Sequence, residues 1–203
     1  MKANIRLHTN GKEKNELVPT DVFHAIPGIW IGGKTYWLQS EMEELNLDEG
    51  ILLHIKRGRV QPNIWMCVVT MTNQSFCPLH VKLIFQYRQK AYKEDCSFIS
   101  PTKNIIYSLS DDTIQLIGGQ STSGAKLTCS VQPLWNNPEN EIWARAESGV
   151  LKYNPMANGN TISLQIIDLE IEENETCEGK SWLINGQCER ELLKINEMLL
   201  KTH

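Results

Sequence analysis

The sequence lacks the short motifs that mark most nucleotide, metal and redox sites. Its six cysteines include no C-x-x-C pair, which is the strongest sequence sign of a zinc or thiol-redox site. The segment Glu178–Ser181 ends like a phosphate-binding loop, but Asn174 stands where that loop needs a glycine. Neither Ser121 nor Ser123 has both glycines of a Gly-x-Ser-x-Gly nucleophile elbow. Local motifs therefore predict no catalytic, cofactor-binding or metal-binding residue.

Long apolar runs are also absent. The apolar stretch Ile64–Val69 is far shorter than the roughly 20 residues that a membrane-spanning helix needs. The first eight residues contain no apolar core of signal-peptide length. We therefore expect a cytoplasmic protein with no membrane partner. Cys177 and Cys188, which flank a glycine-containing loop in this interpretation, would form a disulfide only after export.

Charge of one sign does not dominate any part of the chain. The net charge is -4, from 20 basic and 24 acidic residues. The densest basic stretch, Lys56–Arg59, is too short for the electrostatic footprint of a nucleic-acid-binding protein. The composition accordingly predicts no nucleic-acid partner.

Apolar and polar residues alternate over much of the sequence, which is typical of β-strands with one buried face. In 79–88, one face carries the apolar side chains Leu79, Val81, Leu83, Phe85 and Tyr87. Both faces of 64–72 are apolar, so this strand is expected to lie inside a sheet, with Trp65 in the core. The pattern predicts one antiparallel β-sandwich domain over 1–203, with an immunoglobulin-like arrangement as one possible form.

Turn residues predict which strands are neighbours. Gly32 and Gly33 supply the positive φ angles of a tight hairpin between 29–31 and 35–37. A polar turn at 110–112 joins two further strands. We also expect a hairpin between 64–72 and 79–88, because Asn73–Pro78 is rich in turn formers.

The segment Thr161–Ile171 departs from simple alternation. Ile162, Leu164 and Ile166 share one face, and the apolar phase then slips by one residue to Ile167. A strand with a single buried face cannot bury both sets. We therefore expect a β-bulge near Ile166–Ile167, or a strand that passes from one sheet to the other.

Helical spacing appears only near the C-terminus. Leu192, Ile195 and Leu199 recur on one face of a predicted amphipathic helix over 189–201. Acidic residues in its first turn and Lys201 in its last turn suit the helix dipole. We favour packing of this helix on its own domain over docking into a partner.

The six tryptophans carry the function hypothesis. Trp135 lies in a turn-rich loop and Trp143 alternates with small residues, so both are candidate exposed partner-binding residues. We expect a non-catalytic β-sandwich module that binds a protein or another macromolecule. The alternatives are a hydrolase with a site assembled from dispersed residues, and a carbohydrate-binding module. A metal site at His54 and His80 would require neighbouring strands, and surface histidines are the favoured interpretation.

Overall fold

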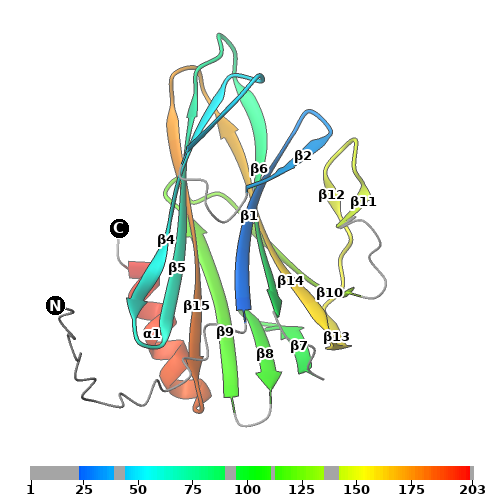
Figure 1. Cartoon of the computed structure of the whole chain (residues 1–203), viewed down its shortest axis with the longest axis vertical. Coiled ribbons are helices and arrows are strands. Elements are labelled where there is room, and N and C mark those ends of the chain that lie inside the picture. The colour runs from blue at the N-terminus through cyan, green and yellow to red at the C-terminus, as the bar shows by residue number, and fades with distance from the viewer. Residues whose placement is uncertain (1–22, 39–43, 90–94, 111–112, 135–141, 202–203) are drawn as a thin grey trace, which may run out of the picture.

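The alternating apolar residues form two antiparallel sheets that pack face to face, as expected for a β-sandwich (Figure 1). The computed structural model describes residues 23–38, 44–89, 95–110, 113–134 and 142–201. The smaller sheet has the strand order β10 (Leu127–Pro133), β14 (Thr161–Ile171), β6 (Leu79–Gln89), β1 (Phe23–Ile31) and β2 (Lys34–Trp37). The larger sheet has the order β13 (Met156–Gly159), β7 (Asp95–Ile99), β8 (Ile106–Ser110), β9 (Thr113–Ser121), β15 (Thr176–Gly186), β5 (Ile64–Asn73), β4 (Ile51–Gln61) and β3 (Glu44–Leu47). This order does not establish an immunoglobulin-like topology.

The main core lies between the two sheets. Leu83 and Ile167 from the smaller sheet pack there with Val69 and Leu183 from the larger one, and all four are 2% exposed or less. Gly179 on β15 allows the sheets to approach closely, since a Cβ atom there would lie 2.3 Å from Leu83 Cδ2. The apolar face predicted for 79–88 is thus confirmed.

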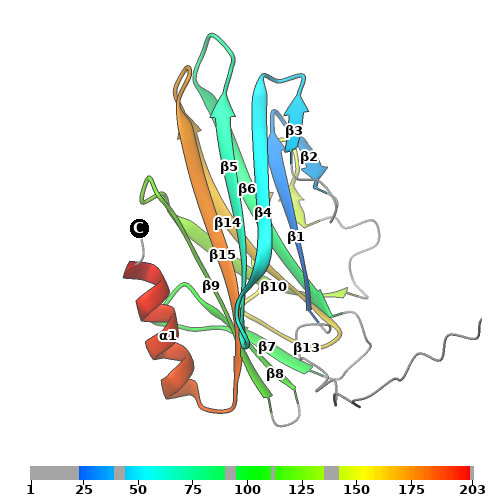
Figure 2. The same ribbon diagram turned by 60° about the vertical axis from the view of Figure 1, so that its left-hand side comes forward.

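Each sheet also has a covered outer face. The helix α1 (Glu189–Lys201) lies on the outer face of the larger sheet, over β9 and β15 (Figure 2). The ribbon of β11 (Trp143–Arg145) and β12 (Val150–Leu151), with the residues beside it, covers the outer face of the smaller sheet. The predicted packing of the helix on its own domain is confirmed. The described residues contain no helix with the length and hydropathy that a membrane crossing requires.

The second cover explains why the phase-slip prediction is wrong. The strand β14 pairs with β6 from Ile162 to Ile171 without a register shift, so it contains no bulge and does not change sheets. Ile162, Leu164 and Ile166 face the ribbon cover, whereas Ile167 and the apolar residues that alternate after it face the main core. A strand between two covers buries both of its faces.

The predicted hairpin between 64–72 and 79–88 is also wrong. The strand β5 belongs to the larger sheet and β6 to the smaller one, so residues 74–78 cross between the sheets. Asn73 anchors this crossing because its Nδ2 donates to the carbonyls of Cys77 (2.8 Å) and Ile171 (3.0 Å). The hairpins β1–β2 and β8–β9 are confirmed, and Gly32 and Gly33 have φ angles of 56° and 85°.

Two further expectations need correction. The predicted loop between Cys177 and Cys188 is largely the strand β15, an interior strand of the larger sheet. Eleven extended residues span about 35 Å, so these two cysteines cannot bond within one chain, and both are free thiols.

Trp65 is 37% exposed, although β5 is an interior strand as predicted. The rejected phosphate-loop fragment Glu178–Ser181 lies within β15.

Candidate functional site

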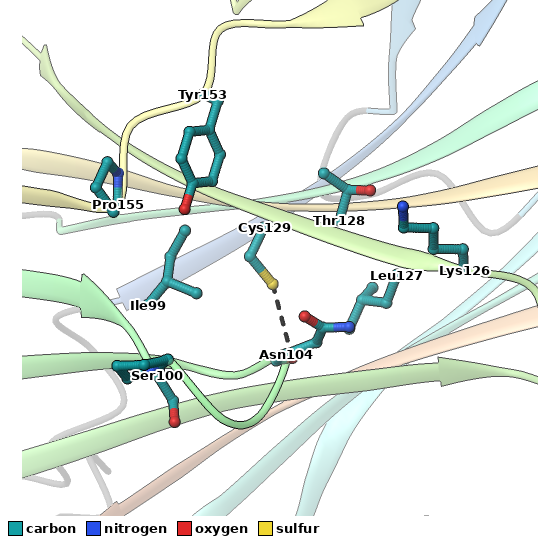
Figure 3. A pocket seen from close by; sticks show the side chains of 10 residues that line it. Ile99, Ser100, Asn104, Lys126, Leu127, Thr128, Cys129, Tyr153 and Pro155 are labelled. Atoms are coloured by element: carbon teal, nitrogen blue, oxygen red, sulfur yellow. Dashed lines mark hydrogen bonds between the residues drawn. The ribbon is translucent and has the colours of Figure 1, made fainter.

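The sandwich is open along part of one edge, where β10 ends the smaller sheet. A pocket of about 360 Å³ lies there (Figure 3). Its walls come from the end of β7 with the following turn, from Asn104, from the first half of β10 and from Tyr153 with Pro155. These segments are far apart in the sequence, so the pocket exists only because the edges of the two sheets meet.

The segment 152–155 closes the other half of this edge. Val131 N–H donates to the carbonyl of Asn154 (2.9 Å), and Ile99 N–H donates to the carbonyl of Pro155 (2.8 Å). Ser130 Oγ donates to the carbonyl of Lys152 (2.6 Å). The segment therefore bridges β10 and β7, and the pocket begins where this bridge ends.

The uncovered half of β10 turns backbone groups outward. Asp168 N–H donates to the carbonyl of Lys126 (3.4 Å), whereas Val131 N–H bonds to Asn154, on the side away from β14. Because the two sides alternate along a strand, residues of even number face β14 and those of odd number face outward. Leu127 and Cys129 thus present their backbone groups to the open edge. Pro133 is also an odd-numbered residue, so its backbone nitrogen faces away from β14. The absence of an N–H group there removes no hydrogen bond between the two strands.

Cys129 lies at the base of the pocket as a buried thiol. Its side chain donates to the carbonyl of Asn104 at 3.6 Å, and the residue is 4% exposed. Burial raises the pKa of Cys129 to about 12. The thiol is therefore protonated at neutral pH, and a protonated thiol is a poor nucleophile. The described residues that line the pocket include no histidine or carboxylate that could remove the proton.

The rim of the pocket combines an aromatic ring with a cation. Tyr153 is 69% exposed, and its ring lies over the pocket opposite Asn104 (Figure 3). Lys126 lines the side near Leu127. An exposed aromatic residue with a polar tip suits a surface that binds another chain.

A second pocket of about 200 Å³ adjoins the first, and Asn104 and Leu127 line both. Its outer wall is the C-terminal half of α1, which contributes Asn196, Glu197 and Leu200. Typical small-molecule sites measure roughly 300–1,000 Å³. The second pocket is therefore of a size for one side chain. Together, the two adjoining pockets are referred to as the groove.

Of the two residues predicted as partner-binding, the structure describes only Trp143, which does not line either pocket. Trp135 lies outside the described residues. Trp143 is 5% exposed, and its Nε1 donates to Thr35 Oγ1 on β2 of the smaller sheet at 2.8 Å. The exposure expected for Trp143 is thus wrong, because its face of the ribbon packs on the sheet.

The histidine pair is not formed either. His54 is on β4 of the larger sheet and His80 is on β6 of the smaller one. His80 Nε2 instead lies 2.5 Å from Asp168 Oδ1. Within the described ranges, no group of three or more His, Cys, Asp and Glu side chains could hold a metal ion.

Sequence reasoning missed the edge position of β10. The proline at its end, Pro133, was the available signal, since proline within a sheet is mostly confined to edges and strand ends. A scan against models of known protein families gives no match, and a comparison with curated protein sequences gives none either.

Proposed function

We propose that this protein is a non-catalytic β-sandwich module that binds an extended segment of a partner protein along the open half of β10. The observation that carries the proposal is the outward backbone of Leu127 and Cys129 beside the 360 Å³ pocket. An added strand would pair with these backbone groups, and the pocket would receive one of its side chains. This is the recognition mode in which main-chain bonds supply affinity and pockets supply specificity.

The surroundings of the edge favour a protein segment over a small substrate. The bridge 152–155 already occupies the neighbouring half of β10 in the manner of a short added strand. Tyr153 offers a ring at the rim, and Lys126 favours an acidic residue in the partner. The hydrolase alternative stays a prediction, and the protonated Cys129 thiol does not support it. The carbohydrate alternative was based on exposed tryptophans; Trp143 is buried, and Trp135 lies outside the described residues.

Selection from a displayed library of random dodecapeptides on the full chain would test the proposal. We expect the selected synthetic peptides to bind with a Kd in the micromolar range, measured by fluorescence polarisation. N-methylation of peptide residues whose N–H faces β10 should weaken binding roughly tenfold per bond. N-methylation of the intervening residues should have little effect, because only alternate residues face the strand.

Matched variants would locate the bound peptide. Lys126→Glu and Tyr153→Ala alter exposed rim residues, so each should weaken peptide binding at least roughly fivefold with an unchanged melting temperature. Lys56→Glu makes the same charge change on an exposed position of β4 in the other sheet and should leave binding unchanged. Binding that is indifferent to the N-methylation register, or to both rim variants, would refute the proposal. So would a selection that yields no specific peptide.

A further inference from the structure

The second pocket contains a buried amide whose donor group is unused. Asn196 on α1 is 1% exposed and lines this pocket. Its Oδ1 accepts a hydrogen bond of 2.9 Å from the indole Nε1 of Trp182. An indole N–H is a donor only, so the oxygen of the Asn196 amide must face Trp182 and the orientation of the amide is fixed.

The fixed orientation leaves the Nδ2 group of Asn196 available. It makes no hydrogen bond with any residue in the described ranges. Nδ2 of Asn196 is not one of the fully enclosed side-chain atoms that lack a hydrogen bond in the described residues. It is therefore accessible from the pocket, and a ligand atom that accepts a hydrogen bond can pair with it.

The charges around the pocket select a neutral ligand group. Lys103 and Glu197 both line it, and their side chains form an ion pair of 3.3 Å. Because these two charges are already paired with each other, a charged ligand group would find no unpaired counter-charge on them. Ile105, Leu127 and Leu200 supply apolar walls that suit the methylene stem of a side chain.

We propose that the second pocket binds a neutral carboxamide side chain, glutamine in particular, of the segment that pairs with β10. The carboxamide oxygen would accept from Asn196 Nδ2, and the carboxamide N–H groups would donate to Glu197. This inference rests on the proposed function for the identity of the ligand as a peptide. Side chains two residues apart on an extended strand are about 7 Å apart, so one segment reaches both pockets across their shared wall.

Nuclear magnetic resonance of the ¹⁵N-labelled full chain can test the pocket without any partner peptide. The probe is N-acetylglutamine N-methylamide, compared with the methionine and glutamate compounds that carry the same end groups. We expect the glutamine compound to shift the Asn196 side-chain NH₂ signals with millimolar affinity. The other two should bind roughly tenfold more weakly, since each loses the neutral donor–acceptor pairing.

Two variants make the assignment specific. Leu200→Trp fills the second pocket from the last turn of α1 and should abolish the shifts. Met198→Trp makes a comparable change at a 61% exposed position of the same helix that does not line the pocket, and it should preserve them. The inference fails if glutamine causes no shift at Asn196, if methionine binds equally well, or if Leu200→Trp has no effect. The proposed function would survive such a failure if selected peptides still obey the N-methylation register.

Discussion

The two outer faces of the sandwich are covered by different elements that solve the same problem. Each cover buries one tryptophan of the sheet and accepts the hydrogen bond of its indole. Trp182 donates to the side chain of Asn196 on α1 at 2.9 Å, and Trp30 donates to the backbone carbonyl of Ala146 at 2.8 Å. Trp182 is 0% exposed and Trp30 is 5% exposed.

The comparison shows what kind of cover a sequence can reveal. A helix repeats its apolar residues at a fixed spacing, so α1 could be predicted from Leu192, Ile195 and Leu199. The ribbon cover has short strands and uses a backbone acceptor, which every residue possesses. Its presence is visible in the sequence only through the sheet beneath it, where Ile162, Leu164 and Ile166 are apolar without an obvious reason.

The largest expected effect is the loss of either tryptophan. Trp182→Ala and Trp30→Ala should each lower the free energy of unfolding by about 3–5 kcal/mol, because each leaves a cavity and an unpaired acceptor. The local consequences should differ. In Trp182→Ala, hydrogen exchange should accelerate in α1, whereas in Trp30→Ala it should accelerate in 142–152.

Trp65→Ala is the matched control for these variants. Trp65 is 37% exposed on β5, so its loss should cost much less than that of Trp182, and neither cover should exchange faster. Urea denaturation gives the stabilities, and exchange followed by mass spectrometry gives the location. If hydrogen exchange accelerates equally in both covers of either tryptophan variant, the two covers open together. That result would contradict the expectation that each tryptophan stabilises only its own cover.

Much of the fold followed from the sequence because alternation is a local property. The strands around Leu83, Val69 and Leu164 lie close to where the apolar patterns predicted them. The errors arose where the prediction depended on a neighbour in space. The segment 73–78 has the composition of a hairpin turn, but composition does not say whether the next strand joins the same sheet.

The strand β15 was missed for a different reason. Its Glu178–Ser181 stretch is polar and contains Gly179, which is typical of a loop. The glycine is needed because Leu83 from the facing sheet occupies the space of its side chain, and Ser181 is satisfied by bonds to Gly118 and Gln165. These partners are remote in sequence, so the polar residues could not be recognised as buried.

The candidate site depended even more on tertiary structure. No residue of the groove belongs to a motif, and the feature that matters is the backbone of Leu127 and Cys129, which has no side-chain signature. Trp143 was a candidate because exposed aromatic rings bind partners. In the structure, its side chain is buried in the apolar cluster between the ribbon cover and the smaller sheet. Sequence reasoning led to the hypothesis of a binding module, but it could not select the sheet edge on which the proposed site lies.

A medium effect is expected from the glycine beside each buried indole. A Cβ atom on Gly118 would lie 2.4 Å from both Trp182 Nε1 and Asn196 Oδ1. Gly118→Ala should therefore cost about 1–3 kcal/mol through overpacking. A Cβ atom on Gly149 would lie 3.0 Å from Trp30 Cε2 and 2.7 Å from Lys82 Cε, at a φ of +59°. Gly149→Ala should cost about 1–2 kcal/mol, mainly through the left-handed backbone, because the lysine chain can move.

The same exchange measurement separates the two glycines. Gly118→Ala should accelerate hydrogen exchange in α1, and Gly149→Ala should accelerate it in the ribbon cover. Gly124→Ala is a control for backbone strain alone, since its φ is +69° and a Cβ atom there would meet nothing within 4 Å. If Gly149→Ala costs no more than Gly124→Ala, the contact with Trp30 contributes nothing and only the φ angle matters.

The smallest expected effect is a pH dependence confined to the smaller sheet. Partial burial alone would raise the pKa of Asp168, but its hydrogen bonds with Lys82 and His80 outweigh burial and lower the pKa. Lys82 Nζ lies 5.8 Å from the centre of the Trp30 ring, so this ion pair stands beside the ribbon cover. A carboxyl group with a lowered pKa stabilises the fold above its unfolded pKa, and this contribution is lost as the pH falls through the folded pKa.

Stability should therefore decline below about pH 4, and Asp168→Asn should remove part of that decline. The carboxylate is nearly half exposed, so solvent limits the effect to less than about 1 kcal/mol. At pH 3, the wild-type ribbon cover should exchange faster relative to α1 than it does at pH 7, and Asp168→Asn should show a smaller change. Glu197→Gln is the matched control, because it removes the exposed ion pair with Lys103 on the helix side. If Glu197→Gln reduces the acid sensitivity of the ribbon as much as Asp168→Asn does, the sensitivity reflects overall charge and does not belong to the smaller sheet.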